Sequence, residues 1–223
     1  MKKFLFIDLE TTGLDNQKHG IHQIAGAVHI DGEVKETFNF KVRPKLGKFI
    51  SPSALEICGV TVKQIRKYKP MKVVYEKLIT IMSKYVNRYN TKDKFFFVAY
   101  YGNFDNQFLR EWFIDNKDNY FGSWFYPGTL DIMVYANGYM SGVRNKVVNL
   151  KLLNVAKLLD VKLENAYDAD ADIQATVEVA EIVAPEVFLN NKKPKLNYDA
   201  QLAKEPYVEK VEEPDFKYRK LKK

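Results

Sequence analysis

The sequence lacks the features of a secreted or membrane-embedded protein. Its 223 residues include a single cysteine, Cys58, so no disulfide can form within the chain, which suits a reducing cytoplasm. Long apolar runs are also missing. The first run, Phe4–Ile7, ends at Asp8 and is too short for a signal peptide, and no window reaches the length of a transmembrane helix. We therefore expect a cytoplasmic protein with no membrane partner.

Positive charge is in excess and is unevenly spread. Lys and Arg outnumber Asp and Glu by 35 to 28, giving a net charge of +7 and a pI of about 9.2, which favours anionic partners such as nucleic acid. Residues 192–223 hold ten basic and six acidic side chains. We predict one domain over residues 1–190 and a basic, flexible tail over residues 191–223, which is either simply solvated or binds nucleic acid or a partner.

The apolar pattern predicts an α/β domain. Three β-rich segments come first, at residues 4–10, 23–30 and 34–43, and Asp31-Gly32 is typical of a hairpin turn between the last two. After a loop with short helices, helices alternate with a short buried strand, and an irregular aromatic segment is expected at 120–127. The strand is expected at 95–99, and the helices at 71–89, 103–114, 130–137, 149–159 and 168–184. This order of elements predicts a mixed sheet.

Four acidic residues lie on the apolar faces of these elements. Asp8 and Glu10 are two apart on the first strand, so both point to the side that carries its phenylalanines. Asp105 heads the apolar stripe of its helix, and Asp172 shares a face with apolar residues of the last helix. Single acids have ordinary explanations, since Glu10 can lie at a frayed strand end and Asp105 can stabilise a helix N-terminus. Four in one small domain favour a common explanation.

A pair of divalent cations explains the four acids together. Mg²⁺ and Mn²⁺ prefer carboxylate oxygens, and the ions cancel the repulsion between the acids. Clusters of carboxylates without histidine or cysteine argue against a zinc site. Two ions about 3.5–4 Å apart can clamp the attacking and leaving oxygens of a phosphodiester displacement, which agrees with the basic charge. The pattern therefore favours metal-dependent phosphoryl chemistry.

Three segments resemble the motifs of the DEDD 3′–5′ exonucleases, the group that includes the proofreading subunits of bacterial replicative polymerases, oligoribonuclease and RNase T. FIDLETTGL resembles the first motif, VAYYGNFDNQFL the second and NAYDADADIQAT the third, in the family's order, over roughly residues 3–184. SPSALEICGVT is similar to a segment between the first two motifs, with Cys58 where histidine is common. The resemblance implies an RNase H-like fold, with a central mixed β-sheet flanked by helices on both faces.

The resemblance also implies roles for individual residues. Two Mg²⁺ or Mn²⁺ ions would be bound by the four acids, which are Asp8, Glu10, Asp105 and Asp172. The main chain and side chains around Thr11, Thr12 and Leu14 would contact the terminal nucleotide of the substrate.

The third motif departs from the family at Tyr167. In the histidine branch a histidine acts as general base, and Tyr167 has its spacing to Asp172. In the tyrosine branch the spacing is one residue shorter, so this chain combines one branch's spacing with the other's side chain. Tyrosine, with a pKa of about 10, is a poor base near neutral pH, whereas histidine, at about 6.5, is a good one. Tyr167 is then a variant that positions water, a lesion that slows catalysis, or a packed residue outside the motif.

Three functions are compatible with these features. The first is a metal-dependent 3′–5′ exonuclease that releases nucleoside monophosphates from single-stranded DNA or RNA, with DNA favoured. As a proofreading enzyme it would need a polymerase partner, because no polymerase domain is recognised in this chain. The second is a nucleic-acid-binding module of the same fold, with chemistry weakened by Tyr167. The third is an enzyme acting on small molecules or nucleotides at the same metal site. The four retained carboxylates favour the first.

Overall fold

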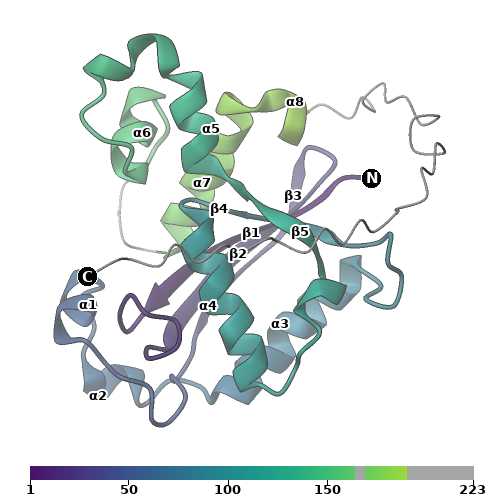
Figure 1. Ribbon diagram of the computed structural model, residues 1–223, viewed down its shortest axis with the longest axis vertical. Helices are drawn as coiled ribbons and strands as arrows, with labels where there is room; N and C mark the ends of the chain where they lie inside the picture. Colours follow the sequence, from purple (N-terminus) through teal and green to yellow (C-terminus); the bar gives the residue numbers. More distant parts are fainter. Residues whose placement is uncertain (164–168, 190–223) are drawn as a thin grey trace, which may run out of the picture. The chain divides into compact units, whose positions relative to one another are not determined.

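The structure is a computed structural model that describes residues 1–163 and 169–189 (Figure 1). Two predictions lie outside the described residues. They are the role of Tyr167 and the basic tail over residues 191–223.

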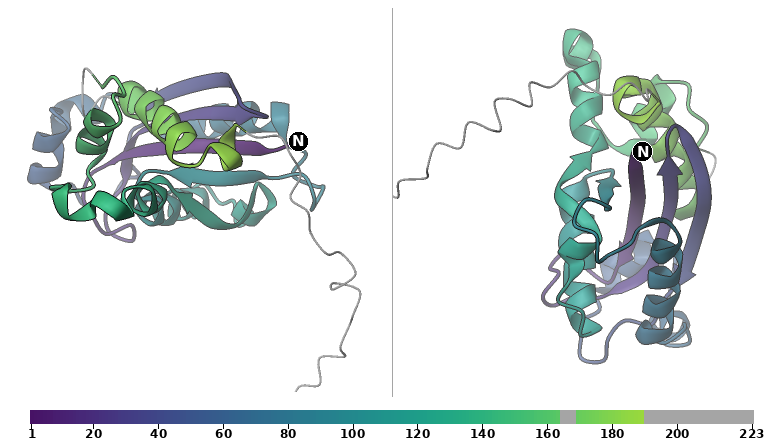
Figure 2. Two further views of the ribbon diagram at one scale, coloured as in Figure 1. Left: turned by 90° about the horizontal axis from the view of Figure 1, so that it is seen from above. Right: turned by 90° about the vertical axis from the view of Figure 1, so that its right-hand side faces the viewer.

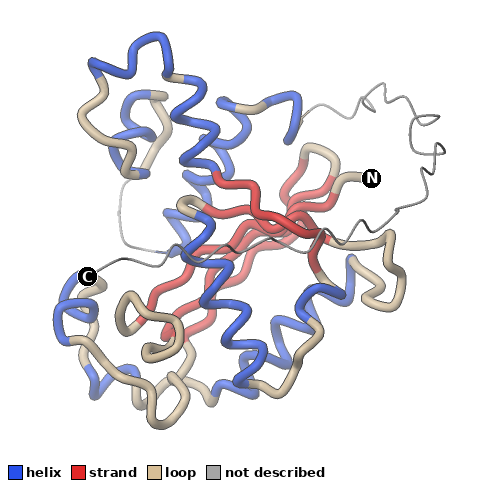
Figure 3. The backbone as a smooth tube through the Cα atoms, viewed as in Figure 1, coloured by secondary structure: helices blue, strands red, loops and turns tan. Residues whose placement is uncertain are grey.

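Five strands form one mixed sheet in the order β3-β2-β1-β4-β5 (Figures 1 and 3). Antiparallel pairs join β1 to β2 and β2 to β3, whereas β4 is parallel to both β1 and β5. The predicted mixed sheet is therefore confirmed. The strands are β1 (Lys3–Thr11), β2 (Ile21–Ile30), β3 (Glu33–Lys41), β4 (Phe95–Ala99) and β5 (Phe125–Asp131).

The turn between β2 and β3 is the predicted hairpin. Asp31 has a φ of 50° and Gly32 a φ of 91°, so both central residues have the positive φ that tight two-residue hairpins require. Asp31 also accepts a hydrogen bond from the main-chain nitrogen of Lys2, at 2.8 Å. The hairpin is thereby tied to the start of β1.

Helices cover both faces of the sheet, as predicted. On one face, Leu5, Ile7 and Leu9 of β1 join a core with α3 and α4; on the other, Phe4 and Phe6 join a core with α5, α7 and α8. The left view of Figure 2 shows α7 lying across the strands, where it contacts β1 and β2. The helices are α1 (Pro52–Ile57), α2 (Val62–Ile65), α3 (Met71–Tyr85), α4 (Gly102–Asp115), α5 (Ile132–Tyr139), α6 (Leu152–Leu158), α7 (Ala169–Val183) and α8 (Pro185–Phe188).

The prediction for residues 120–127 was wrong from Phe125 onward. After a short 3₁₀ turn at Phe121–Ser123 the chain forms β5, where an irregular segment was expected. The strand forms because Phe125 is buried against Phe97 and Phe121. Pro127 obscured it, since proline rarely lies within a sheet, but β5 is an edge strand of the described sheet and an edge tolerates proline.

Three helices begin at other residues than predicted. One of them, expected at 149–159, is α6, which begins at Leu152. The expected helix at 130–137 begins at Ile132, because Asp131 caps it by accepting from the main-chain nitrogens of Met133 and Val134. α4 begins at Gly102 and not at Asn103, following Tyr101, whose φ is 64°. In the described part of the chain, no helix has both the length and the apolar character needed to cross a membrane.

A substitution at Gly26 tests the packing of the sheet. A Cβ at this position in β2 would lie 2.6 Å from the carbonyl oxygen of Phe6 and 2.4 Å from the ring of Phe38. We expect Gly26→Ala to lower the free energy of unfolding by about 1–3 kcal/mol in urea titrations, because the backbone of β1 must move. Gly138→Ala in α5 is the control: its Cβ would meet nothing within 4 Å, and alanine is the better helix former. Equal stability of the two variants would contradict the packing described.

Candidate active site

Two acids lie at the C-terminal end of the central strand β1. Asp8 and Glu10 are both half-buried and face the same side of the sheet as Phe6. β1 pairs with β4 only from Phe4 to Phe6, so its backbone beyond that point is available to side chains. The main-chain nitrogen of Leu9 lies beyond the part of β1 that pairs with β4, and it donates to a carboxylate oxygen of Asp105 at 3.2 Å.

The other two acids come from the first turns of two helices. Asp105 lies in the first turn of α4 and is only 4% exposed. Asp172 lies in the first turn of α7, on a face whose next members, Ala175, Thr176 and Val179, are buried. Carboxylates are favoured near a helix N-terminus, so both helices stabilise the acids that they deliver. Three elements that are far apart in the sequence thus lead to one place.

The acids predicted to form the metal site meet in space. Asp8, Glu10 and Asp172 each offer one oxygen, and these three oxygens lie within 4.8 Å of one another. Asp105 is outside this group of three, yet its carboxylate is close enough for the charges of Asp8 and Glu10 to raise its pKa. The structure therefore brings together residues predicted from three separate motifs.

Burial and mutual repulsion disfavour the ionised form of these acids. Burial raises the pKa of Asp8 well above its usual value, and the charges of Glu10 and Asp172 raise it further. Burial, and then the charge of Asp8, do the same to the pKa of Asp105. Burial also raises the pKa of Glu10, although a hydrogen bond from the Cys58 thiol opposes the change. The cluster is thus destabilising as it stands.

A divalent cation fits this cluster. Oδ2 of Asp8 is buried and has no hydrogen-bond partner among the described residues, and unpaired buried oxygens are costly. The three clustered donors are all carboxylates, the ligands that Mg²⁺ and Mn²⁺ prefer. A positive ion there would satisfy the unpaired oxygen and remove the repulsion.

The loop after β1 holds the residues predicted to contact a nucleotide. Thr11 donates its hydroxyl to the carbonyl of Gly13 at 2.7 Å. Thr12 donates to the carbonyl of Phe49 at 2.6 Å and accepts from the main-chain nitrogen of Gly20 at 3.0 Å. Both threonines are buried, whereas the side chain of Leu14 is 85% exposed. The hydroxyls therefore shape the loop, and Leu14 is the side chain open to contact from outside; its contact with a nucleotide stays a prediction.

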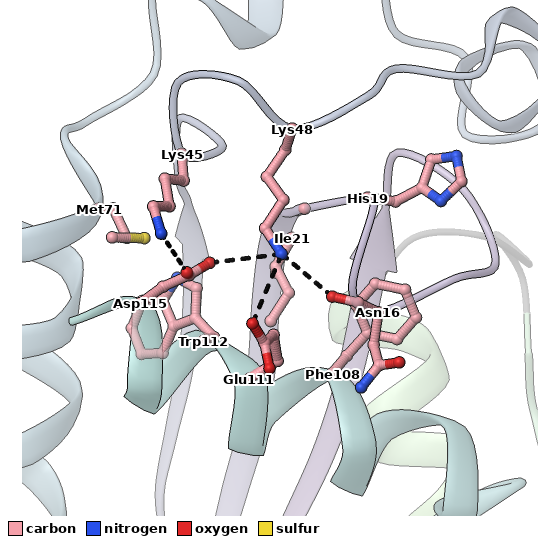
Figure 4. Close-up of a pocket in the computed structure, with 11 residues that line it drawn as sticks. Asn16, His19, Ile21, Lys45, Lys48, Met71, Phe108, Glu111, Trp112 and Asp115 are labelled. Atoms are coloured by element: carbon pink, nitrogen blue, oxygen red, sulfur yellow. Dashed lines mark hydrogen bonds and ion pairs between the residues drawn. The ribbon is translucent and has the colours of Figure 1, made fainter. Parts of the chain in front are cut away.

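A lysine clamp, which sequence reasoning missed, fixes this loop to α4 (Figure 4). Lys48 donates to the carbonyl of Asn16 at 3.1 Å and lies 3.8 Å from a carboxylate oxygen of Glu111 and 3.6 Å from one of Asp115. Lys45 makes a closer ion pair with Asp115, at 2.5 Å. Lys48 is in an irregular segment, so no periodicity marked it; the four-residue spacing of the two α4 acids was the only signal.

The loops after β1 and β3 lie at the same end of the sheet (Figure 3). Two main-chain hydrogen bonds join them: Phe49 donates to Lys18 at 2.7 Å and Ser51 to Thr12 at 2.8 Å. The clamp and these bonds connect the segment that carries Leu14 with the helix that carries Asp105. A continuous set of hydrogen bonds and ion pairs thus joins the predicted nucleotide loop to the helix that carries one acid of the cluster.

Two further residues beside Glu10 were not predicted as site residues. The Cys58 thiol donates to Oε2 of Glu10 at 2.9 Å, and burial, followed by this carboxylate, raises the pKa of Cys58 to about 12. His22 is fully buried, and burial is the main reason why its pKa falls to about 4. They come from separate segments of the chain, so no local motif could have joined them. Tyr167, the remaining predicted catalytic residue, lies outside the described residues.

The chain matches known nucleases in sequence and structure. Residues 5–180 match the model of a protein family described as exonuclease. Over 110 residues, 49% of this chain, it is 31% identical to the PolC-type DNA polymerase III of Thermotoga petrophila. That match spans only 7% of the polymerase.

Solved structures of Escherichia coli exonuclease I have a similar fold. Its complex with a dT13 oligonucleotide aligns with a TM-score of 0.68 at 20% identity, covering 84% of this chain and 43% of that one. The zinc-bound form of its complex with single-stranded DNA aligns with a TM-score of 0.67 at 20% identity, covering 84% and 42%. The predicted RNase H-like fold is thereby confirmed.

The strain in the acid cluster predicts that Asp8→Asn stabilises the metal-free protein. In the unfolded chain the carboxyl of Asp8 ionises with a pKa of about 3.9, whereas in the folded protein its pKa is raised. Folding therefore becomes less favourable as the pH rises from about 4 through the folded-state pKa. The uncharged amide escapes this loss, so we expect its Tm in chelator at pH 8 to be higher by a few degrees, at about 2–4 °C per kcal/mol.

Thermal melts of both proteins in chelator at pH 8 and near pH 4 measure this effect. The difference in Tm should shrink at the lower pH, where Asp8 is protonated in the folded wild-type protein. Glu178→Gln, which removes an exposed carboxylate from α7, is the control and should leave the Tm unchanged. A lower Tm for Asp8→Asn at pH 8 would show that the cluster is not strained.

Proposed function

The chain belongs to the exonuclease family, and on that basis we propose that it hydrolyses phosphodiester bonds from the 3′ end of single-stranded nucleic acid, with DNA favoured over RNA, and releases nucleoside monophosphates. One observation carries the proposal: Asp8, Glu10 and Asp172, from the first and third motifs, have oxygens within 4.8 Å of one another. The dT13 oligonucleotide held by the similar exonuclease I supports DNA as the substrate.

Membership of this family implies dependence on a divalent cation. We assign two Mg²⁺ or Mn²⁺ ions to Asp8, Glu10, Asp105 and Asp172, because the cluster supplies hard oxygen donors, one of them buried and unpaired. When bound, such ions neutralise the acids, stabilise negative charge on the phosphate and lower the pKa of water.

The chain's own residues hold the cluster in place. The Leu9 N–H fixes the Asp105 carboxylate, and the Cys58 thiol fixes one oxygen of Glu10. Such preorganisation means that the acids need not rearrange when a phosphate arrives. We expect Leu14 to pack against the terminal nucleotide, because its side chain is exposed on a loop that Lys48 joins to α4. We propose that the lysine clamp fixes the distance between the end of the substrate and the four acids.

We further assign residues 1–190 as the exonuclease domain and residues 191–223 as a basic tail. The relatives that the chain matches include PolC-type DNA polymerases, which supports a polymerase as partner. A weakened module that only binds nucleic acid is the main alternative, because Tyr167 stands where a general base is expected. The strain in the acid cluster argues against it, since a protein that only binds has no need of buried, repelling carboxylates.

A labelled oligonucleotide tests the proposed activity. We expect a 5′-labelled single-stranded DNA to shorten stepwise from its 3′ end with Mg²⁺ or Mn²⁺, and to stay intact in chelator. Asp8→Ala should slow the reaction by more than about 100-fold, because groups that merely orient metal ligands already contribute about 10- to 100-fold. Glu178→Gln should retain full activity, since Glu178 lies exposed on α7.

Other outcomes of the same assay separate the competing functions. Tight binding without shortening would favour the weakened module, and turnover of nucleotides alone would favour a small-molecule enzyme. Full activity of Asp8→Ala would refute the proposed metal site. Parallel RNA substrates test the preference for DNA. Paired and mispaired primer ends, each with and without a replicative polymerase, test proofreading with a partner.

The residue at 167 predicts a second effect on catalysis. A histidine there can accept a proton from water near pH 7, whereas the tyrosine hydroxyl cannot. We therefore expect Tyr167→His to raise turnover at neutral pH by at least about tenfold, in keeping with the contribution of a general base. Steady-state kinetics from pH 6 to pH 9 measure it.

Tyr167→Phe is the matched control for the hydroxyl. If the tyrosine positions water, the phenylalanine variant should be slower than the wild-type protein. If both variants equal the wild type, the residue is merely packed and is not part of the third motif. Unchanged or lower turnover of Tyr167→His would refute the general-base argument.

A further inference from the structure

A second donor cluster lies beside the acids, and we propose that it is a zinc site formed by Glu10, His22 and Cys58. Each of the three offers one donor atom, a carboxylate oxygen, a ring nitrogen and a sulfur, and these atoms lie within 4.8 Å of one another. They come from β1, from β2 and from the C-cap residue that follows α1. The proposal concerns a cation of another chemical class than the one assigned to the four acids.

His22 is the strongest indication of a ligand. Its side chain is fully buried, and neither ring nitrogen reaches a hydrogen-bond partner in another described residue; the ring approaches only its own main chain. Buried polar groups are nearly always paired, because a lone donor or acceptor loses its hydration without compensation. A metal ion bound by one ring nitrogen would provide the missing partner.

Cys58 supplies the donor that selects the metal. Its sulfur is half-buried and lies 2.9 Å from Oε2 of Glu10, to which the thiol donates. An ion that bridges these two atoms replaces the thiol proton, which leaves to solvent, and binds the thiolate. Thiolate and imidazole together favour Zn²⁺ over Mg²⁺ or Mn²⁺.

The dimensions suit a tetrahedral ion. With Zn–S of about 2.3 Å and Zn–N and Zn–O of about 2.0–2.2 Å, the ligand atoms of such a site are about 3.3–3.7 Å apart. Because no two donor atoms are more than 4.8 Å apart, the ring of His22 needs to approach only slightly. The 2.9 Å between the Cys58 sulfur and Oε2 of Glu10 would widen as the proton leaves. Three protein ligands leave the fourth position of the ion for water or another oxygen. Glu10 and Cys58 are both partly exposed, which gives the ion a way in.

The zinc site shares Glu10 with the acid cluster. Zinc bound by Glu10, His22 and Cys58 would draw the Glu10 carboxylate away from Asp8 and Asp172, so it would inhibit the nuclease. This consequence rests on the proposed function, but binding itself does not. Zn²⁺ would thus inhibit the hydrolysis that Mg²⁺ or Mn²⁺ supports.

Cobalt is the spectroscopic probe for this site. Co²⁺ is added to the full chain without nucleic acid or Mg²⁺, and we expect the near-ultraviolet absorption of a cobalt–thiolate bond, which Zn²⁺ then abolishes by displacement. Because the chain has a single cysteine, this band reports on Cys58 alone. X-ray absorption of the wild-type protein with one equivalent of Zn²⁺ should show one sulfur at about 2.3 Å. That second measurement needs no variant.

Variants separate this site from the acid cluster. Cys58→Ser should abolish the band, and His22→Gln should weaken Co²⁺ binding by at least about tenfold, since even outer residues of metal sites contribute that much. Asp172→Asn and His19→Gln are the controls and should retain the band. No cobalt–thiolate band, no sulfur near zinc, or equal binding by His22→Gln would each overturn the proposal.

Inhibition is measured separately. Zn²⁺ should suppress Mg²⁺-dependent hydrolysis in the wild-type protein at a concentration at least about tenfold lower than in Cys58→Ser. Equal inhibition of the wild-type protein and Cys58→Ser would show that Zn²⁺ does not inhibit through this site. If no Mg²⁺-dependent hydrolysis occurs, the proposed function fails, while the cobalt and zinc measurements still decide the site.

Discussion

The repulsion among buried carboxylates at the end of β1 is the constraint on which the rest of the site depends. Asp8 is opposed by Glu10 and Asp172 and by its own burial. An uncompensated cluster of this kind costs stability, so its presence calls for positive charge from outside the chain. Among the described residues, Lys45 and Lys48 pair with acids of α4. The cation that we propose for this cluster would supply the charge.

The fold keeps the repelling carboxylates together because packing in the two cores fixes the backbone segments that carry them. β1 is the third of five strands and is packed on both faces, so its end cannot move to separate Asp8 from Glu10. α4 and α7 are anchored by their apolar stripes on opposite faces of the sheet, and each presents an acid in its first turn. The free energy of the two cores therefore stabilises an arrangement that the acids alone would not adopt.

The neighbours of Glu10 set what the site binds and what can disturb it. Its carboxylate faces Asp8 and Asp172 on one side and the Cys58 thiol on the other. Glu10 therefore belongs to a cluster of oxygen donors, which binds Mg²⁺ or Mn²⁺ best, and to a cluster with a sulfur donor, which favours Zn²⁺. Because both clusters use Glu10, the ions that they bind would compete for its carboxylate.

Period-two and period-3.6 patterns in the sequence predict the strands β1 to β4, the hairpin turn and the helices that carry Asp105 and Asp172. The same patterns make an acid on an apolar face visible, which is why the four acids are proposed as metal ligands. The sequence did not show β5, which depends on burial of Phe125 against β4 and on an edge that tolerates Pro127. Nor did it show the Lys48 clamp or the meeting of Glu10, His22 and Cys58. These depend on contacts between segments that are distant along the chain, and only the tertiary structure decides which distant segments become neighbours.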